Sequence, residues 1–230
     1  LGMLRTIHAF ARSHLEPSVG NRARDRMAAF FAQMGTHEWA MFGNSQGATA
    51  IRSARLELDN IRAALLHVGR GDNFEQRSLL AFGAAEILMK SGPFSAGVEM
   101  MEGLLKDLPD ESPFLPRALL LGGWFQQRAG RLEVAEVEWL RCVKVAQDPL
   151  NRAYSIRAQA WLGSLLLKRG QTDEARDMGK GAVKAAEALG NKSELAWALL
   201  ELGETHRSTD EFDGAKLALE RALVLFQAIG

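Results

Sequence analysis

Four glycines recur at a constant spacing along most of this chain. Gly83, Gly123, Gly163 and Gly203 lie 40 residues apart. In the last three units one small residue follows the glycine by twelve positions and another follows it by nineteen. The two sets are Ala135, Ala175 and Ala215, and Cys142, Ala182 and Ala222. Small residues at fixed places indicate helices that cross closely at fixed places, and a period of this length is typical of a helical solenoid.

Each of these glycine–alanine intervals contains a turn, so each unit is predicted to be a pair of antiparallel helices. The turns are Ala129-Gly130-Arg131, Arg169-Gly170-Gln171 and Thr209-Asp210-Glu211. Alternating runs of β-branched residues, which would indicate strands, are absent from the sequence. We therefore expect an all-α fold in which about four repeats occupy residues 73–230, at 73–108, 117–148, 151–190 and 193–230. The first repeat is irregular, and Ser193 is expected to cap the last.

A small helical region is predicted over residues 1–72. Helices are expected at 1–15, at 22–34 and at 47–68, with residues 16–21 breaking the chain between the first two. The third helix has the clearest pattern, because Ile51, Leu58 and Leu65 are spaced by seven residues, as are Ala54, Ile61 and Val68. Such a stripe indicates one continuous amphipathic helix.

Charge and cysteine content limit the function classes. The chain has 28 basic and 28 acidic residues, so its net charge does not favour binding to nucleic acid or to an anionic membrane. No run of about 18 uncharged apolar residues suggests a membrane span. Cys142 is the single cysteine, and we interpret it as a buried packing residue in a reducing, cytoplasmic compartment. We expect the chain to be a fragment of a longer protein.

The repeats resemble the tetratricopeptide repeat. Leu162-Gly163 with Gly170, Ala175 and Ala182 follows the pattern of that family, in which a small residue, a turn glycine and two further small residues recur in order. The fourth unit is similar, although Asp210 replaces the turn glycine, and the period is about six residues longer than the usual 34. The resemblance implies a right-handed solenoid of antiparallel helix pairs.

The N-terminal region carries a second resemblance. Three segments are similar to the region that follows the nucleotide-binding core of STAND-type bacterial ATP-dependent transcriptional regulators of the AfsR-like and MalT-like kind. They are Leu4–Ala11, Arg24–Phe31 and Leu56–Leu65, and the Asp59-Asn60-Ile61-Arg62-Ala63-Ala64-Leu65 stretch in the third is the most specific. The resemblance implies that this piece is the sensor and connecting arm of such a regulator, and that a winged-helix and ATPase core belongs to the same protein.

Motifs for chemistry are weak. Gly43-Asn44-Ser45-Gln46-Gly47 matches the hydrolase pattern Gly-x-Ser-x-Gly, but that motif needs a strand before the serine, and helices are expected on both sides. The five histidines lack zinc-ligand spacing. Gly179-Lys180 lacks the rest of a P-loop. We therefore expect no catalytic residue, no metal and no cofactor in this fragment, and an enzyme using Ser45 stays a minor hypothesis.

Binding residues are expected on the first helix of each pair, because in the tetratricopeptide architecture those helices line the concave groove. Counting from the groove positions of that family selects Arg77, Arg117, Trp124, Gln127, Arg128, Arg157, Ser164, Lys168, Trp197, Glu204 and Arg207. Six cations and one acid predict a basic groove that attracts an acidic peptide or a small anion. The two tryptophans offer stacking or cation–π contact.

Two functions remain open from the sequence. The first is a sensor module of a bacterial signal-transduction or transcription regulator, which binds an effector, a peptide or a partner protein in the groove and changes how the ATPase is held. The alternative is a constitutive scaffold for protein–protein interaction without a ligand switch. Neither requires direct contact with nucleic acid or membrane.

Overall fold

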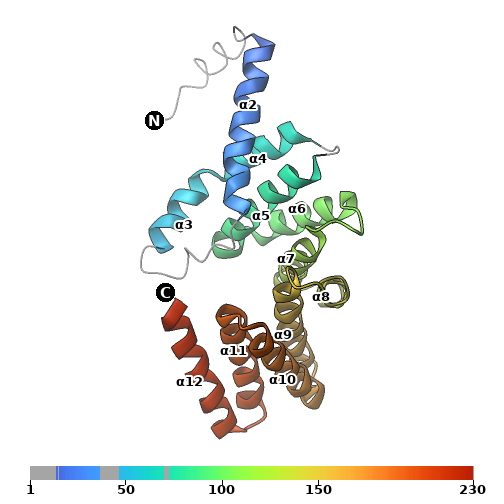
Figure 1. The fold of residues 1–230 in the computed structure, drawn as a ribbon, viewed down its shortest axis with the longest axis vertical. Helices are drawn as coiled ribbons and strands as arrows, with labels where there is room; N and C mark the ends of the chain where they lie inside the picture. The colour runs from blue at the N-terminus through green and yellow to red at the C-terminus, as the bar shows by residue number, and fades with distance from the viewer. Residues whose placement is uncertain (1–13, 15, 37–46, 70–72, 230) are drawn as a thin grey trace. The chain divides into compact units, whose positions relative to one another are not determined.

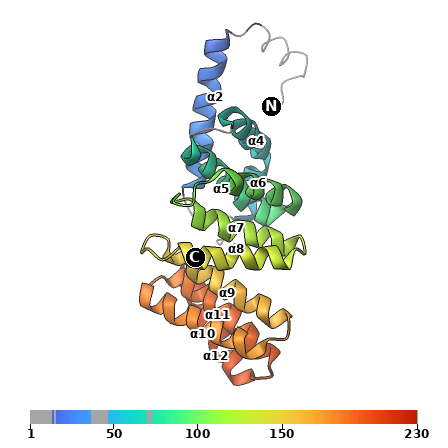
Figure 2. The same ribbon diagram turned by 90° about the vertical axis from the view of Figure 1, so that its right-hand side faces the viewer.

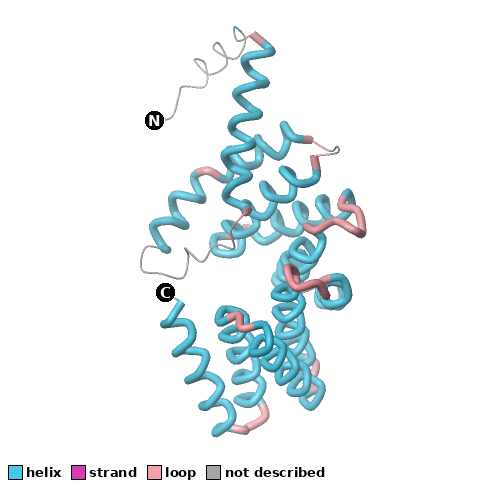
Figure 3. The backbone as a smooth tube through the Cα atoms, viewed as in Figure 1, coloured by secondary structure: helices cyan, strands magenta, loops and turns pink. Residues whose placement is uncertain are grey.

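The computed structural model describes residue 14 and residues 16–36, 47–69 and 73–229. Every regular element in these ranges is a helix, and no strand occurs within them (Figure 3). The chain divides into two compact units, Leu1–Ser91 and Gly92–Gly230 (Figure 1). The predicted helix at 1–15, apart from residue 14, and most of the Gly43–Gly47 segment with Ser45 lie outside the described residues.

The first unit is a cluster of helices around a small apolar core. Its elements are α2 (Pro17–Ala32), a 3-10 turn η1 (Gln33–Gly35), α3 (Gly47–Leu56), α4 (Leu58–Val68) and α5 (Phe74–Ser91). Helix α2 packs on α4 and α5, with Ala28, Phe31, Ile61 and Ala64 buried between them. His67 of α4 contacts Asp25 of α2, with Nε2 and Oδ1 2.7 Å apart.

Two helix boundaries in this unit differ from the sequence prediction. Helix α2 begins at Pro17 rather than at residue 22, because proline is tolerated in the first turn, where its missing N–H has no intrahelical partner. The helix predicted over 47–68 is two helices, since Glu57 interrupts it between α3 and α4. Ala54 and Leu58 of the predicted stripe are nevertheless buried on either side of that break.

The second unit is a stack of antiparallel helices (Figure 2). Its elements are α6 (Phe94–Asp107), α7 (Leu115–Arg128), α8 (Leu132–Val145), α9 (Arg152–Lys168), α10 (Thr172–Leu189), α11 (Lys192–Ser208) and α12 (Phe212–Ile229). Each helix packs on the next along the chain, and α9 also packs on α7 and α11. The first helices of successive pairs therefore lie side by side and share one face.

The boundary between the two units falls inside the stretch predicted as the first repeat. Helix α5 packs with α2, α4 and η1, so it is grouped with the N-terminal helices, whereas α6 packs on α7. The division between the two compact units therefore lies at Ser91/Gly92, and the predicted boundaries of the repeats stay a prediction. The assignment of 1–72 as a connecting arm stays a prediction.

The repeating glycine marks the close helix crossing that its spacing predicts. A Cβ atom on Gly163 would lie 3.2 Å from the carbonyl oxygen of Ala175 on the paired helix. The equivalent distance at Gly203 is 3.5 Å, to the carbonyl oxygen of Ala215. Ala175 and Ala182 are fully buried, and Cys142 occupies the equivalent buried position of its own pair. The interpretation of Cys142 as a packing residue is confirmed.

The turns within the pairs share one backbone conformation. Gly130 and Gly170 both have φ +79°, and Asp210 at the equivalent place has φ +59°. This left-handed region suits glycine and is tolerated by aspartate. The turn equivalence read from the sequence is therefore correct, including the position where glycine is replaced.

The cap of α11 is a residue other than the one predicted. Asn191, not Ser193, is the N-cap, and its Oδ1 accepts hydrogen bonds from the backbone N–H groups of Ser193 and Glu194 at 3.0 and 3.1 Å. Asparagine and serine are equally good caps, so residue preference alone does not distinguish the two positions.

Candidate functional site

The most structured part of the predicted binding face lies on α9 and α11. Arg157 of α9 is bound to Glu194 of α11 by two hydrogen bonds, Nε to Oε2 at 2.7 Å and Nη2 to Oε1 at 2.6 Å. The guanidinium carbon also lies 5.1 Å from the ring centre of Trp197 and 5.9 Å from that of Trp161. Arg157 is thus held in one orientation by a carboxylate and two indole rings.

This arrangement changes the role expected of Arg157. The Arg157 side chain is 17% exposed and that of Glu194 is 2% exposed, so the pair is largely removed from water. A buried carboxylate that loses its cation is strongly destabilising. Arg157 is therefore part of the packing between α9 and α11. It is not the free groove cation that the sequence suggested.

A second group of site residues surrounds Glu201 on α11. Its carboxyl is hydrogen-bonded to Ser164 and lies near the Lys168 ammonium, both on α9. Burial raises the pKa of Glu201, and the contacts with Ser164 and Lys168 oppose that effect. Further along α11, Arg207 donates to Glu204 Oε2 from Nε at 2.9 Å and from Nη2 at 2.7 Å.

The predicted residues on α7 form an aromatic group. Trp124 packs edge-to-face on Phe94 of α6 and on Phe125, with ring centres 5.6 and 5.2 Å apart. The Arg128 guanidinium lies 5.0 Å from the Trp124 ring centre. Arg117 is only 6% exposed, and Gln127 is half-buried. Arg117 therefore offers little surface to a ligand.

Arg77, the remaining predicted residue, is a half-buried side chain on α5 of the first unit. The second unit alone contains five of the predicted cations. Against them the structure places three acids, Glu194, Glu201 and Glu204, where the sequence identified one. The excess of positive charge on this face is therefore smaller than predicted.

Sequence reasoning missed Trp161, Glu194 and Glu201. Trp161 and Glu201 each lie four residues after a predicted position, so they share its helix face, and that spacing was a usable signal. Glu194 had no such signal, because it lies in the first turn of α11 and is 37 residues from its partner Arg157.

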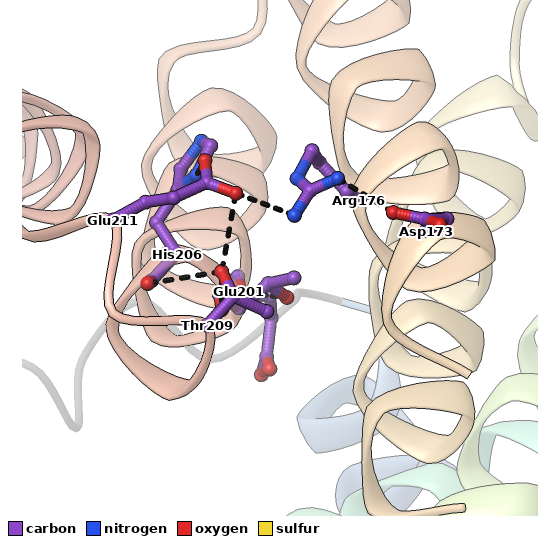
Figure 4. A network of polar contacts seen from close by, with 7 residues as sticks. Asp173, Arg176, Glu201, His206, Thr209 and Glu211 are labelled. Atoms are coloured by element: carbon purple, nitrogen blue, oxygen red, sulfur yellow. Dashed lines mark hydrogen bonds and ion pairs between the residues drawn. The ribbon is translucent and has the colours of Figure 1, made fainter. Parts of the chain in front are cut away.

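A polar network fixes the turn of the last pair to the preceding helix (Figure 4). Glu211 in the turn forms an ion pair with Arg176 of α10, contacts His206 Nδ1 at 2.7 Å and accepts from Thr209 Oγ1 at 3.3 Å. Arg176 also donates from Nη1 to Asp173 Oδ1 at 2.8 Å. The hydrogen bond with His206 and the nearby Arg176 cation lower the pKa of Glu211.

Other chemical features are few. In the described ranges, no three His, Cys, Asp or Glu side chains gather in a way that would hold a metal. None of the described helices is long and apolar enough to cross a membrane. A shallow pocket of about 400 Å³ lies in the first unit, lined by Ala29, Ala32, Gln33, Thr36, Asn73, Glu75, Gln76 and Leu79.

Comparison with known proteins supports the fold. Residues 154–228 match the family model of the tetratricopeptide repeat. The crystal structure of BtubC (BKLC) from P. vanneervenii is similar over 91% of this chain and 90% of that chain, with 16% sequence identity and a TM-score of 0.63. A putative kinesin light chain with TPR-like repeats from Podosopora anserina is 15% identical, covers 89% of this chain and 93% of its own, and has a TM-score of 0.56.

The apo form of the quorum sensor NprR from B. thuringiensis is 16% identical over 90% of this chain and 71% of that chain, with a TM-score of 0.50. A comparison of this sequence with those of curated proteins found no match. At these identities the likeness shows the fold alone. The predicted fold class, an all-α, tetratricopeptide-like solenoid of antiparallel helix pairs, is confirmed.

Proposed function

We propose that this chain is a non-catalytic partner-binding module and that its binding face is the α9–α11 face described above. Tetratricopeptide-like repeats are interaction modules. The observation that carries the choice of face is the pair of half-buried indole rings, Trp161 of α9 and Trp197 of α11, which Arg157 holds in place from between the two helices. Tryptophan and arginine dominate binding energy at interfaces, and a side chain that is already ordered loses little entropy on binding.

The partner favoured by this face is a protein or peptide segment. The charged site residues on α9 and α11 are three cations and three acids, namely Arg157, Lys168, Arg207, Glu194, Glu201 and Glu204. They are spread along both helices, with Lys168 and Glu204 at one end and Trp197 nearer the other. An extended partner with both apolar and charged side chains fits such a pattern better than a small anion, which would require converging cations. A small anionic effector remains the outcome that the experiment below distinguishes.

We further propose that the module serves as the sensor of a STAND-like bacterial regulator in the cytoplasm. The support is the resemblance of residues 1–69 to the arm that connects the ATPase core to the repeats in that family. A quorum sensor is among the proteins with a similar fold. Binding would shift the ATPase only if the ligand prefers one of its two states.

Affinity capture from the cytosol with the 230-residue chain tests the face. Lys168→Glu reverses an exposed charge on α9, and Lys184→Glu reverses an exposed charge on α10, which lies outside the proposed face. We expect a protein or peptide to be retained by the wild type and by Lys184→Glu but not by Lys168→Glu. Equal retention by all three would overturn the assignment of the face.

Metabolite analysis of the same samples separates the functional alternatives. A small anion released only from the wild type and Lys184→Glu would identify a ligand sensor rather than a peptide-binding face. A protein partner whose affinity is unchanged when cytosolic metabolites are removed would favour a constitutive scaffold. Thermal unfolding of each variant checks that the loss of binding is not a loss of structure.

A further inference from the structure

A buried carboxyl group lies among α6, α7 and α8, away from the proposed binding face. Glu138 of α8 turns its Oε2 atom towards α7, where Gly122 leaves room for it, since a Cβ atom at that glycine would lie 2.4 Å from Oε2. The Oε2 atom is buried and has no hydrogen-bond partner. An unsatisfied carboxylate oxygen in such a position is costly.

Gln126 of α7 lies beside this carboxyl and has its own unsatisfied oxygen. Its side chain is 1% exposed and within hydrogen-bonding range of Glu138. The Gln126 Nε2 atom donates to Glu102 Oε1 of α6 at 3.0 Å, and Arg131 Nη1 donates to the same oxygen at 2.9 Å. The Gln126 Oε1 atom, in contrast, is buried without a donor.

A proton on Glu138 removes the cost of burying a charged oxygen without a partner, because a neutral carboxyl loses less than a carboxylate when it leaves water. We propose that Glu138 is protonated in the folded protein, so that the joint between α6, α7 and α8 packs around a neutral group. When Glu138 ionises, a buried negative charge appears near the Glu102 carboxylate of α6, and the joint is weakened.

The surroundings of Glu138 are consistent with a retained proton. Burial raises the pKa of Glu138 from 4.5 to about 7, and the Glu102 carboxylate of α6 adds to the increase. The Gln126 side chain and the Arg141 cation of α8 oppose it, and Arg141 is itself paired with Asp110. Among the described residues, the charges that act on Glu138 thus come from α6 and α8, while α7 presents a neutral amide.

The pH dependence of the protein's stability follows from the raised pKa of Glu138. A group whose folded pKa is raised contributes stability below its unfolded pKa, and that contribution is lost as the pH rises through the folded value. Between pH 4.5 and about 7, the folded chain keeps a proton that the unfolded chain releases. The device is therefore a joint that loosens as the pH rises towards neutrality.

The experiment uses the 230-residue chain with Glu138→Gln, which replaces the carboxyl O–H with an amide N–H donor of similar shape. Glu133→Gln, an exposed position on the same helix, is the control. We expect the unfolding equilibrium constant of the wild type to rise, relative to Glu138→Gln, by up to about tenfold per pH unit between about pH 5 and about pH 7. Glu133→Gln should follow the wild type.

Carbon-13 NMR of the Glu138 carboxyl, assigned through the backbone of the wild type, provides a second readout that does not depend on the variant folding. A titration midpoint near neutrality supports the proposal. A midpoint in the ordinary range for glutamate would overturn it, as would a Glu138→Gln variant with the same pH slope as the wild type.

Discussion

Arg157 and Glu194 form a bidentate ion pair that joins the first helices of two successive repeats. The Arg157 Nε and Nη2 atoms donate to the two carboxylate oxygens of Glu194 at 2.7 and 2.6 Å. The pair is largely buried, so each charge offsets the cost of removing the other from water. Disturbing it should affect the stack as well as the binding face.

Replacing Glu194 alone should therefore lower the free energy of unfolding more than replacing both Arg157 and Glu194 does. We expect Glu194→Ala to lower the free energy of unfolding by about 3 kcal/mol, because the Arg157 cation is left without its carboxylate. The double variant Arg157→Met/Glu194→Met should lie within about 1 kcal/mol of the wild type. Denaturant titration of the wild type and the two variants measures both values. A double variant that loses as much stability as Glu194→Ala would contradict a coupled pair.

The glycine at the helix crossing should not accept a large side chain. Gly163→Leu is expected to lower the free energy of unfolding by about 3 kcal/mol, because the new side chain meets the backbone of Ala175. Gly181→Leu is the matched control on α10, where no atom lies within 4 Å of a new Cβ. That change should raise stability by about 0.5 kcal/mol through helix propensity. Equal melting temperatures would contradict the crossing.

The turn positions should respond to substitution in opposite directions. Gly170→Ala places a Cβ on a residue with φ +79°, which should cost about 1 kcal/mol. Asp210→Gly relieves the same conformation in the last pair and should raise stability by about 0.5 kcal/mol. No atom lies within 4 Å of a new Cβ at Gly170, so the expected loss of stability comes from backbone strain and not from a steric clash. Thermal unfolding checks both, and a stabilising Gly170→Ala would refute the explanation.

Acidification should release the Glu211 network. The pKa of Glu211 is lowered, so its carboxylate contributes stability above the unfolded pKa, and that contribution disappears as the pH falls through the lowered value. We expect the wild type to lose melting temperature below about pH 5 more steeply than Glu211→Gln does. Glu220→Gln, an exposed change on α12, should keep the wild-type slope. Parallel slopes in all three would count against the network.

Cys142 should be unreactive while the chain is folded. Burial raises the pKa of its thiol to about 12, and the sulfur lies 3.3 Å from the Pro116 carbonyl oxygen. Because only the thiolate attacks disulfide reagents, Ellman's reagent at about pH 8 should modify the denatured protein at once and the folded protein only as it opens. Rapid modification of the folded chain would show that the thiol is accessible.

The repeat architecture follows from the residue pattern without knowledge of the fold. The glycine and alanine positions recur at a fixed period, and each marks a contact between helices that are neighbours in the chain. Gly163 and Ala175 meet because a three-residue turn brings their helices together, so the pattern and the contact have the same local cause. The same reasoning identified Asp210 as a turn residue and Cys142 as a core residue.

Details at helix ends were less predictable. Pro17 serves as a helix start rather than a break, and Asn191 rather than Ser193 is the cap. At α11 the neighbours Asn191 and Ser193 have similar capping preferences, and at α2 the proline fits the first turn of a helix as well as a break. Glu57 interrupts a stripe whose spacing alone indicates one helix.

Which charges of the predicted site are available depends on the packing of helices that are distant in the sequence. Arg157 and Lys168 are equivalent cations in the sequence, yet one is locked to Glu194 and the other is exposed. Glu194 reaches Arg157 from 37 residues away, because α9 and α11 lie side by side in the stack. Glu138 and Gln126 likewise acquire their unsatisfied oxygens only when α7 and α8 pack and exclude water. A repeat period specifies which helices meet, whereas the state of a charge depends on the side chains that meet it and on the water that is removed.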